Sequence, residues 1–229
     1  MTDRLSLHEW NLQPDVAVAL QRELAARVIR TDALKGEVRR VAGVDMAINE
    51  GNNMARAAVV LLTYPELEVI ERHVYEEPIR MPYVPGLLSF REIPCILGAF
   101  DQLKEQPDLV MVDGQGIAHP RYLGIASHLG LWLDLPTIGC AKSILRGYYD
   151  EKALGENAGD WVPLTYKRQT VGAVLRTRVR VKPMIISLGH RISLETSLHY
   201  VLACCKGYRL PEPTRLADKL SKDNAYQET

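Results

Sequence analysis

Three apolar, strand-like runs follow one another between residues 38 and 75, and the turns between them are only a few residues long. The runs cover residues 38–48, 57–63 and 67–75. Connections this short can join only antiparallel neighbours, because a parallel crossover needs about a dozen residues or more. We therefore predict that the fold begins, after a helix at residues 15–29, with a three-stranded antiparallel sheet.

The pattern changes after residue 78, where apolar runs of two different periods alternate along the chain. Helical spacing at 86–106 and 122–133 alternates with short apolar runs at 109–112 and 137–140. An order of strand, helix and strand is typical of parallel pairing. The sequence thus predicts an α/β fold, in which a mixed β-sheet of three antiparallel strands and then parallel strands is flanked by helices.

The C-terminal third predicts more strands and a last helix. A polar loop at 147–160 precedes two or three strands that reach Ser187, and Ser193 suits the N-cap of a helix that continues to residue 206. The alternation in LRTRVRVK (175–182) predicts a strand with four basic side chains on one face. Such a row could follow phosphates, or it could protect an exposed sheet edge from aggregation.

Composition and charge place limits on the partners. Lys plus Arg equals Asp plus Glu at 28 each, so binding to a polyanion needs a local basic patch. The 4 cysteines form no C-x-x-C pair, and no apolar run approaches the ~20 residues that cross a bilayer. No secretory signal stands at the start. We expect a cytoplasmic protein with free thiols and no membrane contact, folded as a single domain over residues 1–229 with a flexible tail from about residue 218.

Two acidic residues lie in or directly after predicted buried strands. Asp45 lies in the first strand among apolar and small neighbours, and Asp113 follows the apolar run 109–112. If these two strands pair in parallel, both carboxylates reach the same edge of the sheet, and Glu92 on the intervening helix can face that edge. Taken alone, Asp45 could instead pair with an arginine, and Asp113 could cap the turn before Gly114.

Three carboxylates gathered at one edge either take up protons or bind a divalent cation, because their mutual repulsion is strong at low dielectric. All-oxygen ligation, without cysteines or paired histidines at zinc spacing, suits Mg²⁺ or Mn²⁺. Antiparallel strands that carry the first acid, a crossover helix, and a parallel strand that carries the second resemble the ribonuclease H-like nucleases. This resemblance implies metal-assisted hydrolysis of a phosphodiester.

Three further residues could contact a nucleic acid. Tyr83 stands between prolines in MPYVPG (81–86), so this stiffly held ring could stack on a base or pack at the domain edge. TIGCAKS (137–143) lacks the glycines of a phosphate-binding loop, which leaves Lys142 as a phosphate contact or as a surface lysine. His119 could touch a phosphate or relay a proton, although most lone histidines in loops do neither.

Taken together, these segments resemble the endonuclease V family over nearly the whole chain. The motifs appear in order as VAGVD (41–45), PYVPGLLSFRE (82–92), VDGQGIAHPR (112–121), LGIASH (123–128), TIGCAKS (137–143), Gly189-His190 and PEPTR (211–215). Each motif is modest alone, but their order along one chain is highly specific.

The resemblance implies a ribonuclease H-like fold and several sets of site residues. The ligands of Mg²⁺, or of Mn²⁺ as a substitute, would be Asp45, Asp113 and Glu92. The wedge that separates the strands at the lesion would be Pro82, Tyr83, Val84 and Pro85. Main-chain groups that face the base would come from Gly86, Leu88 and Gly114. The phosphate on the cleavage side would contact Lys142 and His119, and Lys142 would act in catalysis with the three acids.

The implied activity is metal-dependent nicking of DNA at the second phosphodiester bond 3′ to deoxyinosine, which leaves a 3′-hydroxyl and a 5′-phosphate, by a monomer that acts in DNA repair. Inosine-containing RNA is a second substrate to consider. Some relatives carry a histidine where this chain has Asp218, so the role of Asp218 stays open. Two interpretations compete: another structure-specific ribonuclease H-like nuclease, and a non-catalytic nucleic-acid-binding module. The proline-flanked Tyr83 argues against the first, and the three acids argue against the second.

Overall fold

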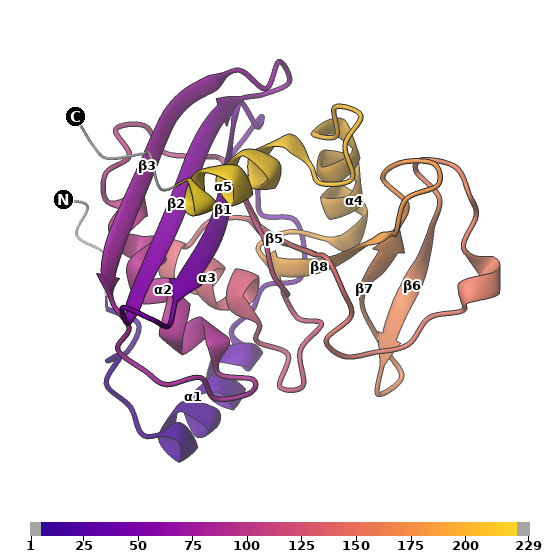
Figure 1. The fold of residues 1–229 in the computed structure, drawn as a ribbon. Coiled ribbons are helices and arrows are strands. Elements are labelled where there is room, and N and C mark those ends of the chain that lie inside the picture. Colours follow the sequence, from indigo (N-terminus) through magenta and orange to yellow (C-terminus); the bar gives the residue numbers. More distant parts are fainter. Residues whose placement is uncertain (1–5, 224–229) are drawn as a thin grey trace.

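One eight-stranded mixed sheet runs through residues 6–223, which are the residues that the computed structural model describes (Figure 1). Its strand order is β3-β2-β1-β4-β5-β8-β7-β6. The strands are β1 (Arg40–Asn49), β2 (Met54–Thr63), β3 (Val69–Pro78), β4 (Leu109–Val112), β5 (Thr137–Ala141), β6 (Trp161–Tyr166), β7 (Gln169–Leu175) and β8 (Met184–His190). The predicted α/β class and mixed sheet are confirmed.

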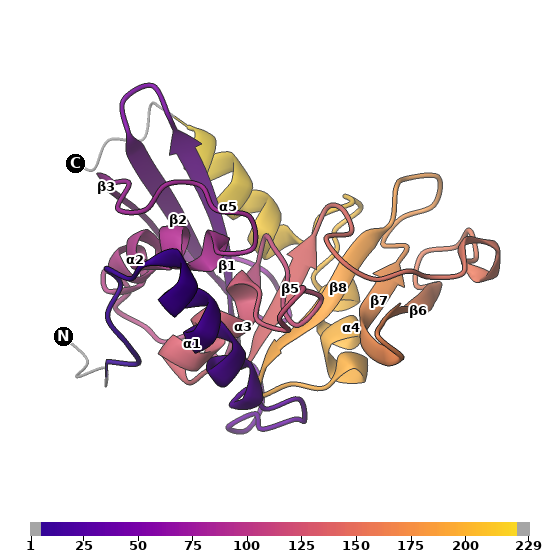
Figure 2. The same cartoon turned by 90° about the horizontal axis from the view of Figure 1, so that it is seen from below.

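Helices cover both faces of this sheet. They are α1 (Pro14–Ala26), α2 (Leu88–Phe100), α3 (Ile125–Leu133), α4 (Leu194–Ala203) and α5 (Glu212–Lys222). α2 and α3 pack with Ala42 and Val110 of the sheet, whereas α4 and α5 pack with Val41 and Met111. Neighbouring strand residues point to opposite faces, so these central strands are buried on both sides. Figure 2 shows α5 and α2 on opposite sides of β1 and β2. Between residues 6 and 223, no helix is long and apolar enough to cross a membrane.

The first three strands are antiparallel, as the short turns predict. In the β1–β2 turn, the side-chain oxygen of Asn49 accepts a hydrogen bond from the main-chain N–H of Gly51 at 3.0 Å. This Asx turn explains why the NEGNN composition marks a tight reversal. The register places Asp45 opposite Ala58, so the acid is flanked by a small side chain on β2.

β4 pairs in parallel with β1 and β5, and this pairing positions the two predicted aspartates. Val44 lies opposite Val112, and the main-chain N–H of Asp113 donates a hydrogen bond to the Val44 carbonyl at 3.0 Å. Asp45 and Asp113 each stand one residue beyond this pair. The two acids therefore lie side by side where the parallel pairing of β1 and β4 ends, at the carboxyl end of β4, and α/β folds bind ligands at this end of parallel strands.

The predicted strand at 175–182 is wrong, because β7 ends at Leu175. The guanidinium of Arg176 turns back and donates hydrogen bonds to the carbonyls of Gly155 at 2.7 Å and Val181 at 2.9 Å. Arg180 has φ +60, a left-handed conformation that ends extended structure. The basic side chains of this segment therefore do not form the row on one strand face that their alternation suggests.

The expectation of a flexible tail from about residue 218 also needs correction. Residues 218–222, where we expected a flexible tail to begin, complete α5. The tail residues 224–229 lie outside the described part of the chain. The four cysteines are free, as expected.

A chain of polar contacts ties the N-terminal segment to α2 and α3. The Nδ1 atom of His8 donates to the Glu9 carbonyl at 2.8 Å, so Nε2 of the neutral His8 ring is an acceptor. Nε2 of His128 donates to that atom at 2.8 Å, and Trp132 Nε1 also points to it at 3.3 Å. Nδ1 of His128 then accepts from the Ser89 hydroxyl at 3.0 Å. In this arrangement both rings are neutral, and a proton on Nε2 of His8 would face the two N–H donors that point at that atom.

This network predicts that acid destabilises the protein. Burial lowers the pKa of His128 well below its ordinary value of 6.5, and burial lowers the pKa of His8 as well. Below about pH 6.5 these two histidines bind protons in the unfolded chain but not in the folded one, so their contribution to the free energy of unfolding should fall as the pH falls. Urea unfolding at pH 7.5, 6.5 and 5.5 measures this. His8→Gln, whose amide oxygen can accept both donors without titrating, should have a shallower dependence on pH, and an unchanged slope would contradict the assignment.

Candidate active site

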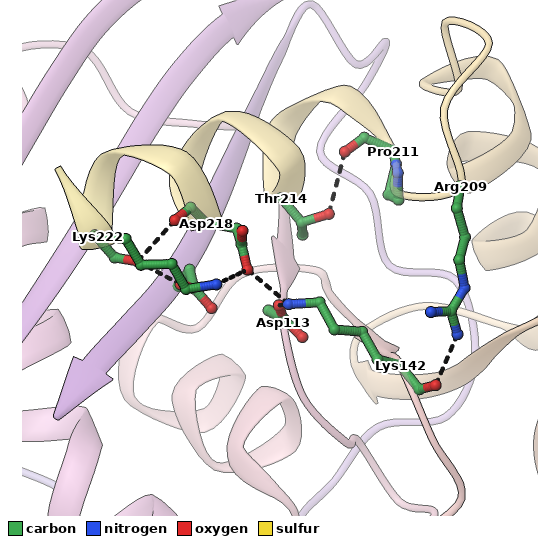
Figure 3. A network of polar contacts seen from close by, with 9 residues as sticks. Asp113, Lys142, Arg209, Pro211, Thr214, Asp218 and Lys222 are labelled. Carbon is green, nitrogen blue, oxygen red and sulfur yellow. Dashed lines mark hydrogen bonds and ion pairs between the residues drawn. The ribbon is translucent and has the colours of Figure 1, made fainter.

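Three aspartates from three different elements meet at the edge of the sheet. Asp45 lies in β1, Asp113 follows β4, and Asp218 lies on α5, and one carboxylate oxygen from each lies within 4.8 Å of the others. Figure 3 shows Asp218 projecting from α5 toward Asp113. The strand pattern predicts the meeting of Asp45 and Asp113, and the structure adds Asp218 to them. Glu92 on α2 is not one of these three, although its carboxyl is close enough to feel the charges of Asp45 and Asp113.

α5 can approach the other two aspartates because β1 has a glycine, Gly43, where the helix begins to pack on the strand. A Cβ atom at Gly43 would lie 1.9 Å from the carbonyl oxygen of Pro213, so only glycine lets the start of α5 lie directly on the strand. Ala217 and Leu220 then pack into the core. One turn beyond Ala217, the Ser221 hydroxyl donates a hydrogen bond of 2.5 Å to Oδ2 of Asp45.

Burial and crowding shift two of these acids, Asp45 and Glu92, toward their neutral forms. Burial, helped by the charges of Asp113 and Asp218 and opposed by the Ser221 hydrogen bond, raises the pKa of Asp45 to about 6. Burial, with the nearby charge of Asp45, raises the pKa of Glu92 to about 8, against the opposing effect of Arg91. Shifts of this kind mark a place where negative charge is concentrated, as in a cation site.

Lys142 supplies a positive charge inside this cluster. Its Nζ atom lies 2.5 Å from Oδ2 of Asp113, in an ion pair without hydrogen-bond geometry, and 2.6 Å from Oδ1 of Asp218 (Figure 3). Partial burial favours the neutral amine, but the two carboxylates outweigh it and raise the pKa of Lys142 well above its usual range. The same ion pairing has the opposite effect on the acid: Lys142 and Lys222 lower the pKa of Asp218.

The donor set fits a hard divalent cation. The three aspartates offer oxygen atoms alone, which Mg²⁺ and Mn²⁺ prefer. Oδ2 of Asp113 is buried and faces the Lys142 ammonium group at 2.5 Å, so the structure already places a positive charge against this oxygen.

A pocket of about 340 Å³ opens beside the carboxylates. The predicted substrate-binding residues that line it are Tyr83, Gly86, Leu88, Gly114 and His119, and Asp113 and Lys142 form part of the same wall. Pro82, Val84 and Pro85 are not in the lining; they flank Tyr83, whose side chain is 65% exposed. Asp113 is thus the one predicted metal ligand in this lining, and it shares the wall with Gly86, Leu88 and Gly114, which the family resemblance predicts to face the base.

Gly86, at one side of the pocket, is fixed by a residue that the sequence did not single out. Gly86 has φ +80, and its carbonyl accepts hydrogen bonds from Nε2 of Gln21 at 3.0 Å and Nη2 of Arg121 at 2.7 Å. Gln21 is fully buried on α1, and its Nε2 also donates to the Leu123 carbonyl at 2.8 Å. On the other side, a Cβ atom at Gly114 would lie 2.5 Å from Cγ2 of Ile125, so glycine lets this loop pack closely on α3.

His119 lies in the wall of the pocket and is only 4% exposed. Burial, with the nearby charge of Arg121, lowers its pKa to about 4, so the ring is neutral near pH 7. Its Nδ1 accepts a hydrogen bond from the main-chain N–H of Arg121 at 3.2 Å. These contacts suit a residue that shapes the pocket; its predicted contact with a phosphate stays a prediction.

A mixed sheet with carboxylates at the edge of its parallel strands is the arrangement of the ribonuclease H-like nucleases. In fold, the chain is similar to A. aeolicus Argonaute, with a TM-score of 0.54 at 14% identity over 82% of this chain and 29% of that one. The family model described as Endonuclease V matches residues 22–219, and the chain belongs to this family. It is therefore an endonuclease that acts as a deoxyribonuclease.

Named relatives support the same assignment. The endonuclease V of Gloeobacter violaceus is 53% identical over 95% of this chain and 88% of its own length. The crystal structure of endonuclease V from Streptomyces avermitilis has a TM-score of 0.87 at 41% identity, covering 93% of each chain. That of Ciona intestinalis endonuclease V, in complex with a DNA containing an inosine followed by a ribo-adenosine, has a TM-score of 0.80 at 29% identity, covering 92% of this chain and 97% of that one.

Gly43→Ala should destabilise the protein and displace α5. The added methyl group would meet the Pro213 main chain, and overpacking of this kind costs about 1–3 kcal/mol of unfolding free energy. Denaturant unfolding measures the loss. Gly51→Ala is the matched control, because its new Cβ would meet only the side-chain oxygen of Asn49 at 3.3 Å. Equal stability of the two variants would show that α5 does not depend on this contact.

Proposed function

We propose that this endonuclease nicks DNA at the second phosphodiester bond 3′ to deoxyinosine and leaves a 3′-hydroxyl and a 5′-phosphate. The observation that carries the proposal is the shared wall of the two sites: Asp113 belongs to the carboxylate cluster, and Gly114 beside it lines the pocket. A base held in this pocket would keep its own strand close to the carboxylates. The relative from Ciona intestinalis, which binds an inosine-containing DNA, supports hypoxanthine as that base.

In this proposal Asp45, Asp113 and Asp218 hold Mg²⁺, or Mn²⁺ in its place, and Glu92 completes the acidic cluster. When bound, the cation would stabilise negative charge at the reacting phosphate and lower the pKa of an attacking water. Lys142 would turn its ammonium group from the aspartates toward the phosphate, because a cation that displaces it from Asp113 frees the group to pair with another anion.

The pocket residues would act on the lesion in different ways. Tyr83, exposed and held between Pro82 and Val84-Pro85, would wedge into the duplex beside the lesion. Main-chain groups at Gly86, Leu88 and Gly114 would face the base, and His119 would hold the wall or reach the cleavage-side phosphate. We further propose that the enzyme is a cytoplasmic monomer that acts in the repair of deaminated adenine in DNA, with inosine in RNA as a second substrate.

The activity is tested on a labelled duplex with one deoxyinosine, beside a duplex with deoxyadenosine at that position. Wild-type protein with Mg²⁺ should give one nick at the second bond 3′ to the inosine, and chelator should abolish it. Asp113→Asn keeps the size of the side chain but removes a ligand charge, so the nicking rate should fall more than about 100-fold with an unchanged melting temperature. Equal cutting of both duplexes would contradict inosine recognition, and Mg²⁺-dependent turnover by Asp113→Asn would contradict the metal assignment.

Tyr83→Ala should weaken lesion binding without disturbing the carboxylates. Stacking of an aromatic side chain on a base is worth about 1–3 kcal/mol, so the Kd for the inosine duplex should rise roughly 5- to 100-fold. Trp161→Ala, which removes a 47% exposed aromatic from the edge strand β6, is the control and should bind normally. Fluorescence anisotropy with Ca²⁺ in place of Mg²⁺ measures both constants. A normal Kd for Tyr83→Ala would exclude the wedge.

A further inference from the structure

Arg209 holds the main chain of Lys142. It lies in the connection between α4 and α5, and its Nη2 atom donates hydrogen bonds to the carbonyl oxygens of Lys142 at 2.7 Å and Pro183 at 2.9 Å. Its Nε atom donates to the carbonyl of Lys182 at 2.8 Å. Figure 3 shows the guanidinium reaching across to Lys142 from the segment that leads into α5. One side chain thus joins three carbonyls from two different segments of the sheet.

Arg209 is itself fixed at its main chain. The hydroxyl of Thr177, a residue only 6% exposed, donates a hydrogen bond of 2.7 Å to the Arg209 carbonyl. The chain then passes through Leu210 to Pro211, whose carbonyl accepts hydrogen bonds from the Thr214 hydroxyl at 3.1 Å and from the N–H of Arg215 at 2.9 Å, in the first turn of α5. Arg209 therefore sits at the fixed start of the segment that carries Asp218.

Lys142 is thereby held at both of its ends. Its carbonyl is bound by Arg209, and its ammonium group is bound by Asp113 and by Asp218, which follows Arg209 on α5. A lysine side chain has four rotatable bonds and is 39% exposed here, so its ammonium group is placed accurately only if its backbone is also fixed.

We propose that Arg209 is a positioning residue, which acts through Lys142 by fixing the loop after β5 relative to α5. The proposal rests on the proposed function, because it gives Arg209 a part in the reaction that Lys142 serves. The planar guanidinium is required, since its rigid fork reaches all three carbonyls at once. A lysine at this position would keep the charge but could not hold both segments.

The first test is the single-turnover rate of nicking on the deoxyinosine duplex at saturating DNA. Arg209→Gln and Arg209→Lys should both lose roughly 10- to 100-fold in rate, because a misplacement of about 1 Å costs that much, while the KM stays within about twofold. Lys206→Gln is the matched control, since Lys206 lies in the same connection and its ammonium donates to the carbonyl of Glu66, far from Lys142 in sequence and contacts. It should nick at the wild-type rate.

A double-mutant comparison separates positioning from general support of the fold. If Arg209 acts through Lys142, then adding Arg209→Gln to Lys142→Ala should cause no further loss of rate. A further loss equal to that of the single variant would overturn the proposal, and so would a wild-type rate for Arg209→Lys. Arg209→Lys also decides the matter if Arg209→Gln does not fold.

A third measurement is independent of activity. Lys142 should react slowly with an acetylating reagent, because its ammonium group is held by two carboxylates, and Arg209→Gln should increase its labelling several-fold relative to the exposed Lys152. Mass spectrometry of the peptides measures this ratio. An unchanged ratio would overturn the proposal. Failure of the wild-type protein to nick inosine DNA would instead contradict the proposed function, and the labelling would still test the role of Arg209.

Discussion

The parallel pairing of β1 with β4 is the interaction from which the rest of the site is built. The hydrogen bond from the N–H of Asp113 to the Val44 carbonyl sets the register between the two strands. A shift of one residue would turn Asp45 or Asp113 toward the opposite face, because strand side chains alternate. The antiparallel strands β2 and β3 extend the sheet on one side, and β5 on the other brings Lys142 to the same edge. The meeting of these side chains therefore depends on the register between β1 and β4 more than on any single residue.

This register brings several negatively charged side chains together, and their proximity does not by itself stabilise the fold. Burial and mutual repulsion raise the pKa of Asp45 and Glu92, and the ion pairs of Lys142 offset part of the repulsion. Replacing a buried ionic cluster with apolar side chains is often neutral or stabilising for a fold, so stability alone does not account for this arrangement. The same segment joins the cluster to the pocket: Asp113 lies near the other two aspartates, and Gly114, next in the chain, lines the pocket.

The sequence allowed much of this to be predicted, for identifiable reasons. The apolar runs around Asp45 and before Asp113 are buried on both faces, so their strands and the meeting of the acids follow from pattern. Asp218 could not be found that way, because α5 is polar and its burial depends on the approach of Pro213 to Gly43. The regular spacing of small and apolar residues at 213, 217, 220 and 221 was the available signal. At 175–182 the alternation was real, but the bonds of Arg176 to nearby carbonyls prevent a strand. The substrate-binding roles came from family resemblance and not from periodicity.

The first and last helices each contribute to a different part of the site, α1 to the pocket and α5 to the carboxylate cluster. On the pocket side, Gln21 of α1 is buried with its amide bound to the Gly86 and Leu123 carbonyls, which fixes the root of the loop that carries Tyr83. On the carboxylate side, α5 brings Asp218 and Ser221, and Arg209 joins its leading segment to Lys142. The central strands carry two of the three aspartates, but neither the carboxylate cluster nor the pocket is complete without these flanking segments. Since each side is held by hydrogen bonds to main-chain carbonyls, the geometry at the reacting centre depends on backbone positions far apart in the sequence, and a change in either terminal helix should be felt at Asp113.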